Sequence, residues 1–531
     1  MFDQFWVLLL WLSPCLAAVP ASKGLLHMFQ LSSYQFAGYF RTLQRRWKLE
    51  LLPGLLLCLG SLALCVGADY LSRGGQMFWL PLASLLTLGL GIALGAFSHP
   101  CKQSVTPLRY TWRLKRLALV MAAAMVILGL LLRTILPVLG ASALLPLFLP
   151  LWVALAAALV WPLEHAVKRM YERDAKRILS RQTGLICIGV TGSYGKTSVK
   201  FFLDTLLRQR YSVLATRDSF NTPMGLTRSI REDLQPAHRV FIAEMGARHR
   251  RDIRDLCRLV QPTIGILTAV GPQHLETFRS LERVRDTKYD LIKALRADGF
   301  AVFYNDGAVC RELFDKTDKP KALVGQKGDD MWAEDLELGY DGSAFTLCLK
   351  DGTRLKVSTQ LCGEHNVRNI LLAAVTACHL GLSDVQLQRG IALMQPVKAR
   401  FKPEKQADGS IVINNGFNAN PESSRSALSL LATYPGRKIV ITPGFVELGA
   451  LENDYHIKLG EHIAGAADIV LLIGHKRTLP IRQGLTDKGF DPENIHVFIS
   501  LKEAQAYLDT FRLPGDIILY ENDLPDQYSE K

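Results

Sequence analysis

The sequence contains no CxxC pair, although it has 10 cysteines among its 531 residues. This absence argues against a zinc ribbon or a thioredoxin-type motif, and a disulfide scaffold is not expected in a chain this long. Acidic residues are scarce in residues 1–180, which hold 17 Lys and Arg against 6 Asp and Glu. Because residues 181–531 carry an excess of only 2 positive charges, the net charge of +13 does not indicate a nucleic-acid partner.

The same basic third contains long apolar runs. Four of them have the roughly 20 residues that a helix needs to cross a bilayer. They cover residues 49–68, 77–98, 117–137 and 143–163. A fifth run at 5–19 is shorter, contains Pro14 and lacks the preceding basic residues of a secretory signal. It is therefore either a short first span or a signal segment.

Basic residues are concentrated in the segments 20–48 and 99–116 and in the segment after residue 163. The opposite connections carry only Arg73. Since Lys and Arg stay preferentially on the cytoplasmic side, this distribution predicts a multi-pass protein of the cytoplasmic (inner) membrane. Five spans with an outside N-terminus would place residues 164–531 in the cytoplasm.

From about residue 181 the pattern changes to short β-rich runs separated by helical segments. Such runs cover residues 184–190, 239–246, 263–270 and 300–304, and later 438–442, 496–500 and 516–520. This alternation predicts parallel sheets with crossover helices. We therefore predict an α-helical transmembrane bundle in residues 1–180, an α/β P-loop central domain in 181–395 and an α/β Rossmann-like C-terminal domain in 396–531.

The first predicted strand leads directly into TGSYGKTS, residues 191–198, and then into a helix. Glycines let backbone amides turn toward a phosphate chain, Lys196 can neutralise phosphate oxygens, and the Thr197 hydroxyl can bind Mg²⁺. The common GxxxxGK[ST] spacing is not met, because position 190 is Val. The residues predicted to bind the nucleotide phosphates are Gly192, Ser193, Gly195, Lys196, Thr197 and Ser198.

The shorter TGxxGKT form resembles the Mur ligase family, the ATP-dependent enzymes that build the peptide stem of bacterial peptidoglycan. Glu244 ends the apolar strand VFIAE, where its carboxylate could reach a Mg²⁺ ion at the loop. The resemblance implies that His274, in TAVGPQHLETF, lies at a second Mg²⁺, and that Lys288 reacts with CO₂ to form a carbamate that helps to hold it. On this basis the catalytic residues are Lys196, His274 and Lys288, and the metal ligands are Thr197, Glu244, His274 and Lys288. Without the resemblance, a lone His is more often structural and a helical Lys more often a solvated charge.

Further motifs extend the resemblance over about residues 185–475. The run FNANP, residues 417–421, resembles the SYNANP motif of the branch that adds D-alanyl-D-alanine. By the same comparison Asn305, Arg400 and Asn415 would surround the nucleoside, whereas Asn221, Asn418 and Asn420 would contact substrate.

Three departures from the family pattern bear on activity. The family's Asp before SYNANP is here Asn415, and its GDMxELG turn is here PGFVELG, residues 443–449. The family's N-terminal domain for the UDP-sugar is replaced by the apolar helices.

The resemblance implies an ATP-dependent, ADP-forming ligase that activates a carboxylate as an acyl phosphate and joins it to the amine of an amino acid or peptide. The expected cofactors are ATP and two Mg²⁺ ions. The expected partners are a lipid-linked or membrane-proximal carboxylate and membrane lipid, in cell-wall or envelope polymer synthesis. A poly-γ-glutamate-type synthase, a transport ATPase and a non-catalytic nucleotide-binding membrane scaffold are the alternatives.

Overall fold

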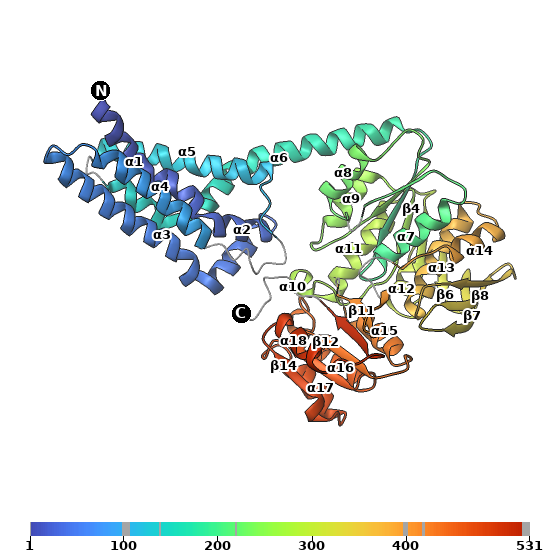
Figure 1. The fold of residues 1–531 in the computed structure, drawn as a ribbon. Coiled ribbons are helices and arrows are strands. Elements are labelled where there is room, and N and C mark those ends of the chain that lie inside the picture. The colour runs from blue at the N-terminus through green and yellow to red at the C-terminus, as the bar shows by residue number, and fades with distance from the viewer. Residues whose placement is uncertain are drawn as a thin grey trace. The chain divides into compact units, whose positions relative to one another are not determined.

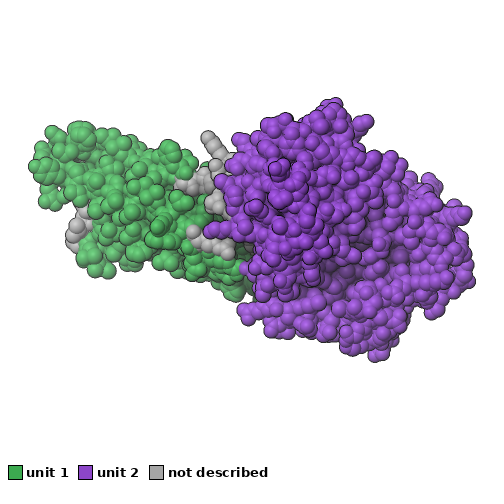
Figure 2. Space-filling model, turned by 90° about the horizontal axis from the view of Figure 1, so that it is seen from below, with its two compact units in different colours: residues 1–169, 525–527 green, residues 170–524, 528–531 purple. Residues whose placement is uncertain are grey.

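The computed structural model describes residues 2–97, 107–136, 140–217, 220–396, 402–416 and 420–522. The chain divides into two compact units, one extending to Arg169 and the other beginning at Met170 (Figures 1 and 2). The predicted classes, helical first and α/β afterwards, are confirmed. The exact domain limits at residues 180 and 395 remain a prediction.

The first unit is helical. Its elements are α1 (Phe2–Ala21), α2 (Lys23–Leu31), α3 (Phe36–Arg73), α4 (Trp79–Phe97), α5 (Trp112–Ile135), the 3₁₀ helix η2 (Ala141–Phe148) and α6 (Leu149–Arg181), which continues into the second unit. Within the described residues, five helical stretches are long and apolar enough to cross a membrane by length and composition. The predicted runs all fall on these stretches. The basic segment between the first two runs folds as α2 and the start of α3.

The first apolar run is a helix packed into this unit. Gly91 and Gly95 of α4 face α1, and a Cβ atom on them would lie 2.3 Å from the carbonyl oxygen of Ala17 and 2.1 Å from that of Pro20. Small residues allow such close approach of two helix backbones. The side chain of Trp11 is 1% exposed and donates its ring N–H to the carbonyl oxygen of Gly129 in α5 at 2.6 Å. α1 is therefore an integral part of the helical unit.

The second unit contains a nine-stranded sheet in the order β2-β3-β1-β4-β5-β6-β7-β8-β9. The strands are β1 (Ile186–Thr191), β2 (Val213–Ala215), β3 (Val240–Glu244), β4 (Ile264–Leu267), β5 (Phe300–Tyr304), β6 (Lys321–Gly325), β7 (Met331–Leu338), β8 (Ser343–Leu349) and β9 (Arg354–Thr359). The pairs from β2 to β7 are parallel, as predicted. The pairs β7–β8 and β8–β9 are antiparallel, which was not predicted. Their connections are short turns, and a short turn can join only antiparallel strands.

Helices flank this sheet. They are α7 (Lys196–Leu207), α8 (Pro223–Glu232), α9 (Asp252–Val260), α10 (Leu275–Phe278), α11 (Leu281–Ala294), α12 (Val309–Asp315), α13 (Glu364–His379) and α14 (Asp384–Ala392). In α7 the apolar residues Val199, Phe202, Leu203 and Leu206 follow the helical period and are at most 2% exposed. The same face fixes the direction of the glycine loop that precedes α7.

A second, six-stranded sheet follows in the order β10-β11-β15-β12-β13-β14. Its strands are β10 (Lys402–Lys405), β11 (Ile411–Asn415), β12 (Lys438–Thr442), β13 (Ile469–Ile473), β14 (Ile495–Phe498) and β15 (Ile517–Glu521). Its helices are α15 (Pro421–Leu431), η3 (Gly449–Leu451), α16 (Glu452–Ala464), α17 (Leu479–Asp487), η4 (Pro492–Asn494) and α18 (Leu501–Phe511). All pairs are parallel except β10–β11, and the last strand is inserted between β11 and β12. This insertion brings Glu521 of β15 beside Asn415 of β11.

Candidate active site

The glycine loop lies between β1, which pairs with β3 and β4, and α7. Gly195 has a φ of +78°, in the region that favours glycine, and α7 begins at the next residue. A Cβ atom at Gly195 would lie 2.4 Å from the side-chain oxygen of Asn369, and one at Gly192 would lie 1.9 Å from that of Thr268. The loop thus has room for glycine alone at both positions, and it directs the first turn of α7 toward a ligand at the carboxyl edge of the sheet.

The loop is tied to the segment that follows β4. The Ser193 N–H donates to the carbonyl oxygen of Ala269 at 2.7 Å, and its hydroxyl donates to the carbonyl oxygen of Gly271 at 2.9 Å. The Tyr194 hydroxyl donates to the carbonyl oxygen of Pro272 at 3.0 Å. In this conformation Ser193 therefore holds the loop in place. Its predicted contact with phosphate stays a prediction.

Lys196 and Lys288 converge on one backbone oxygen. The ammonium of Lys196 donates to the carbonyl oxygen of Gly192 at 2.6 Å, and the Lys288 Nζ donates to the same oxygen at 2.9 Å. Lys288 is 1% exposed. Burial, together with the positive charge of Lys196, holds the pKa of Lys288 well below its usual range. The neutral amine, which is the form that reacts with CO₂, is favoured at this position.

Glu244 ends β3 beside the glycine loop, because Val190 of β1 pairs with it across the sheet. One carboxylate oxygen lies 3.2 Å from the ammonium of Lys200, and the other accepts a hydrogen bond from the Asn221 side chain at 3.1 Å. Lys200 and Glu244 are both buried. Asn221, which was predicted to contact substrate, is thus hydrogen-bonded to the predicted metal ligand Glu244. Its substrate role remains a prediction. Lys200 was not predicted from the sequence, although a lysine one turn after Lys196 on an otherwise apolar helix face was a usable signal.

The donor set at the loop suits Mg²⁺ bound together with nucleotide. Mg²⁺ usually takes one or two protein carboxylates and completes its shell with water and phosphate oxygens. Glu244 supplies one buried carboxylate, and the Thr197 side chain, 6% exposed, lies in the first turn of α7. Throughout the described residues, no group of three or more His, Cys, Asp and Glu side chains gathers as a metal cluster. A metal at this site would therefore depend on the phosphates for much of its coordination.

His274 links the domain of the nine-stranded sheet to the domain of the six-stranded sheet. Its Nδ1 is hydrogen-bonded to a carboxylate oxygen of Glu447, in the PGFVELG turn, and the Glu276 N–H donates to the carbonyl oxygen of Glu447 at 3.2 Å. Burial lowers the pKa of His274 in spite of this carboxylate. Burial also acts to raise the pKa of Glu447, but the hydrogen bond and charge of His274 outweigh it and lower that pKa. Both shifts favour a neutral imidazole that donates its Nδ1–H to an ionised Glu447.

Only some of the residues predicted to contact the nucleoside or the substrate can be assigned to one site. The Asn305 amide donates to both carboxylate oxygens of Asp329 at 3.0 Å, so its side chain is turned toward that acid. Asn420 is the N-cap of α15 and accepts a hydrogen bond from the Ser423 N–H at 3.0 Å. Arg400 and Asn418 lie outside the described residues. The ligand roles of all four stay predictions.

A buried carboxylate lies beside Asn415 that sequence reasoning did not find. Glu521, at the end of β15, is fully buried and accepts a hydrogen bond from the Asn415 amide at 2.9 Å and another from the Ser424 hydroxyl. Among the described residues, no cation pairs with Glu521. Burial raises its pKa to about 7, although the hydrogen bonds from Ser424 and Asn415 act in the opposite direction. Position 415 itself carries no acid, but the carboxylate of Glu521 lies next to it on the neighbouring strand.

Replacing Glu521 with Gln should remove a pH-dependent loss of stability. Because the folded-state pKa is raised from 4.5 to about 7, the wild-type protein loses stability as pH rises through this window. The shift from 4.5 to about 7, at 1.36 kcal/mol per pKa unit, gives a loss of about 3 kcal/mol. Glu521→Gln should match wild type at pH 4.5 and exceed it by about that amount at pH 8, as measured by denaturant unfolding. The exposed Glu337→Gln variant is the control, and equal pH profiles for Glu521→Gln and wild type would contradict the prediction.

Two family descriptions match the second unit. The Mur ligase middle domain matches residues 190–377, and the Mur ligase glutamate ligase domain matches residues 399–520. A UDP-N-acetylmuramoyl-tripeptide–D-alanyl-D-alanine ligase of Mycobacterium bovis is 34% identical, and the match covers 63% of this chain and 70% of the relative. The chain belongs to the Mur ligase family. Ligases of this family use ATP and Mg²⁺, release ADP and form an amide bond, so the predicted enzyme class is confirmed.

Other relatives and solved structures agree with this family assignment. The ligase of the same name from Synechocystis is 30% identical, over 63% of this chain and 71% of its own length. Among solved structures, MurF from Acinetobacter baumannii superposes with a TM-score of 0.61 at 24% identity, over 68% of this chain and 79% of that one. MurF from Thermotoga maritima in complex with ADP gives a TM-score of 0.60 at 24% identity, over 67% and 80%. These structures show the fold. Both family matches begin after α6, so the first unit's helices lie outside them.

Proposed function

We propose that this Mur ligase joins a membrane-proximal carboxylate to the amine of an amino acid or peptide, in cell-wall or envelope polymer synthesis. The observation that carries the chemistry is the convergence of Lys196 and Lys288 on the Gly192 carbonyl oxygen. Lys196 at the glycine loop would provide a cation for a triphosphate, while the buried Glu244 and a carbamylated Lys288 would provide ligands for its metal ions. Phosphoryl transfer depends mainly on such positioning and charge stabilisation.

In this proposal, the substrate carboxylate attacks the γ-phosphorus of ATP and ADP leaves. The amine then attacks the acyl phosphate carbon, with loss of a proton and release of phosphate. Lys196 and the first turn of α7 bind the phosphates, and Thr197 with Glu244 would hold Mg²⁺, which neutralises charge on the phosphoryl oxygens when bound. His274 and Lys288 would serve a second Mg²⁺, with Lys288 carrying a carbamate formed when its neutral amine adds to CO₂ and releases a proton.

The membrane placement rests on the five apolar helical stretches of the first unit, which are long enough to span a bilayer. The distribution of basic residues supports a cytoplasmic location for the ligase domains. The names of the relatives give UDP-N-acetylmuramoyl-tripeptide and D-alanyl-D-alanine as their substrates. We propose a peptide carboxylate of the same kind for this chain, carried on a lipid, because apolar helices replace the family's sugar-nucleotide domain.

The test supplies the full-length protein in neutral detergent with ATP, Mg²⁺ and D-alanyl-D-alanine. A lipid-linked muropeptide and its UDP-linked counterpart are offered in parallel, with ADP release and product mass as readouts. We expect the lipid-linked form to be converted with the higher kcat/KM. Exclusive turnover of the UDP-linked form would overturn the lipid-linked proposal, and amine-independent ATP hydrolysis alone would overturn the ligase reaction.

A further inference from the structure

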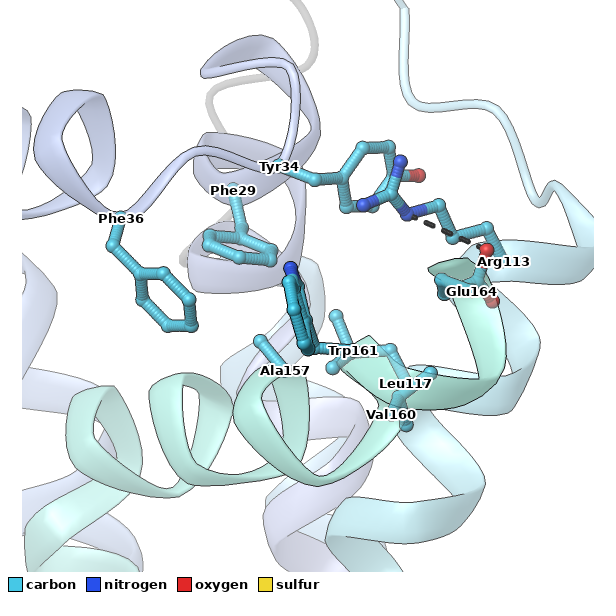
Figure 3. A pocket seen from close by; sticks show the side chains of 9 residues that line it. All are labelled: Phe29, Tyr34, Phe36, Arg113, Leu117, Ala157, Val160, Trp161 and Glu164. Carbon is cyan, nitrogen blue, oxygen red and sulfur yellow. Dashed lines mark ion pairs between the residues drawn. The ribbon is translucent and has the colours of Figure 1, made fainter. Parts of the chain in front are cut away.

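The first unit contains a hollow lined by aromatic side chains (Figure 3). It is a shallow hollow that is open to solvent on one side. Residues from the α2–α3 region, α5 and α6 line it: Phe29, Tyr34, Phe36, Arg113, Leu117, Ala157, Val160, Trp161 and Glu164. None of these residues has a role in the ligase chemistry described above.

The hollow lies where polar and apolar stretches of the chain meet. Arg113 is in the first turn of α5, just before its apolar run, and Glu164 directly follows the apolar run of α6. Both belong to the basic segments that the charge distribution puts on the cytoplasmic side. The hollow is thus at the cytoplasmic end of the predicted spans, which is the level of lipid headgroups.

The side chains that line the hollow are buried on one side of it and exposed on the other. Phe29 and Leu117 are 2% and 3% exposed and form a buried floor, whereas Phe36 and Trp161 are 37% and 58% exposed at its open side. In Figure 3 the rings of Phe29, Phe36 and Trp161 lie along one side, with Arg113 and Glu164 at the other end. An apolar chain could therefore lie along the rings while a polar head stays at the charged end.

The charged end has an excess of positive charge. Glu164 pairs closely with Arg116, whose Nε donates to it at 2.7 Å, while the Nε of Arg113 is 3.8 Å from its other oxygen. The Arg113 guanidinium lies over the Tyr34 ring, 4.1 Å from the ring centre, and its side chain is 43% exposed. One carboxylate facing two guanidinium groups leaves one positive charge. The nearer partner, Arg116, takes most of the Glu164 charge, so this excess is on Arg113.

Hydrogen bonds at the start of α5 hold Arg113 in position before any ligand binds. The Gln30 side chain donates to the carbonyl oxygen of Arg109 at 2.8 Å and accepts from the Arg109 N–H at 3.0 Å. The hydroxyl groups of Tyr34 and Thr111 are 3.3 Å apart, and Thr111 caps α5. These bonds tie the start of α5 to α2. A preformed site lowers the entropic cost of binding.

We propose that this hollow binds a phosphate-headed lipid, with the phosphate on Arg113 and the first part of the chain against Phe36 and Trp161. A guanidinium recognises phosphate through two parallel hydrogen bonds. A free phosphate ion would gain nothing from the aromatic wall and would meet Glu164, so hydrocarbon and phosphate are both required. The inference deepens the proposed function, on which it rests, by assigning the site for the lipid part of the substrate.

Native mass spectrometry of the full-length protein in neutral detergent would test the site with farnesyl phosphate, farnesol and inorganic phosphate. We expect one farnesyl phosphate to bind saturably and farnesol to bind much more weakly. Arg113→Gln should raise its Kd about tenfold to a hundredfold, as expected for a lost charge-assisted hydrogen bond. Phe36→Ala should weaken binding too, whereas Arg133→Gln, at the opposite end of α5, should not.

The inference would be overturned by an unchanged Kd in Arg113→Gln, by equal binding of farnesol, or by displacement of farnesyl phosphate by equimolar inorganic phosphate, which would indicate a simple anion patch. Trp161→Phe keeps an aromatic ring at the open side, so it serves as the control for a folding defect caused by a substitution in the hollow.

Turnover of the substrate separates this proposal from the proposed function. If only a soluble substrate is converted but Arg113 still governs farnesyl phosphate binding, the proposed function fails and the site stands. If lipid-linked turnover is identical in Arg113→Gln, the site fails and the function stands.

Discussion

Lys196→Met should lower the kcat/KM for ATP about a thousandfold, because one preorganised donor to a transferring phosphoryl group commonly contributes a hundred- to a thousandfold. The structure gives the physical reason. Lys196 begins α7 and its ammonium reaches back over the loop to the carbonyl oxygens of Gly192 and Ser193, at 2.6 and 3.1 Å. From there it can move onto phosphate oxygens with little rearrangement. ADP release with saturating amine and carboxylate measures the effect.

The control must separate lost chemistry from a collapsed loop, since Lys196 also supports that loop. Thermal unfolding of Lys196→Met should stay near wild type, because Ser193 and Tyr194 hold the loop independently at Gly271 and Pro272. A variant that keeps more than a tenth of wild-type kcat/KM would contradict the assignment of Lys196 to the phosphates.

Lys288→Met should lower kcat by about a hundredfold or more, in line with the loss of one charge-stabilising group at a phosphoryl-transfer site. Wild-type activity should also fall in CO₂-depleted buffer and return when bicarbonate is added. The cause is the lowered pKa of Lys288, which favours the neutral amine needed for carbamate formation. The carbamate itself should give a ¹³C NMR signal in protein incubated with ¹³C-bicarbonate.

Lys293→Met is the matched control, because Lys293 is on the same helix α11 but exposed to solvent. It should keep wild-type activity and bicarbonate dependence. Full activity of Lys288→Met, or a carbamate signal that persists in it, would show that Lys288 is a structural lysine whose role ends at the Gly192 carbonyl oxygen.

Much of the fold could be predicted because its signals are local. The apolar runs, the β-rich runs and the glycine loop each depend on residues close in sequence. The antiparallel strands β8 and β9 were missed, although the sequence of β9, RLKVST, alternates exposed and buried residues and was a usable signal. The capping role of Asn420 was missed too, because the FNANP resemblance drew it toward substrate.

The candidate site could be predicted less completely. Glu244, Lys196 and Lys288 were predicted because each belongs to a motif, and the structure places Lys196 and Lys288 on one loop oxygen. Their roles in the reaction stay predictions. The contacts that set the charge and position of the site residues were not predicted. Lys200 on Glu244 and Glu447 on His274 are pairings across the fold, separated in the second case by 173 residues. Arg113 and Glu164 likewise come from different helices.

The sequence by itself determined where the chain is apolar, where it forms strands and helices, and where a glycine loop leads into a helix, because backbone preferences and hydrophobic period act over a few residues. Only the tertiary structure decided which distant charges meet. Asn415 and Glu521 are 106 residues apart and meet because β15 inserts between β11 and β12. Strand order depends on the packing of the whole domain, so the neighbour of a buried carboxylate cannot be read from its own segment.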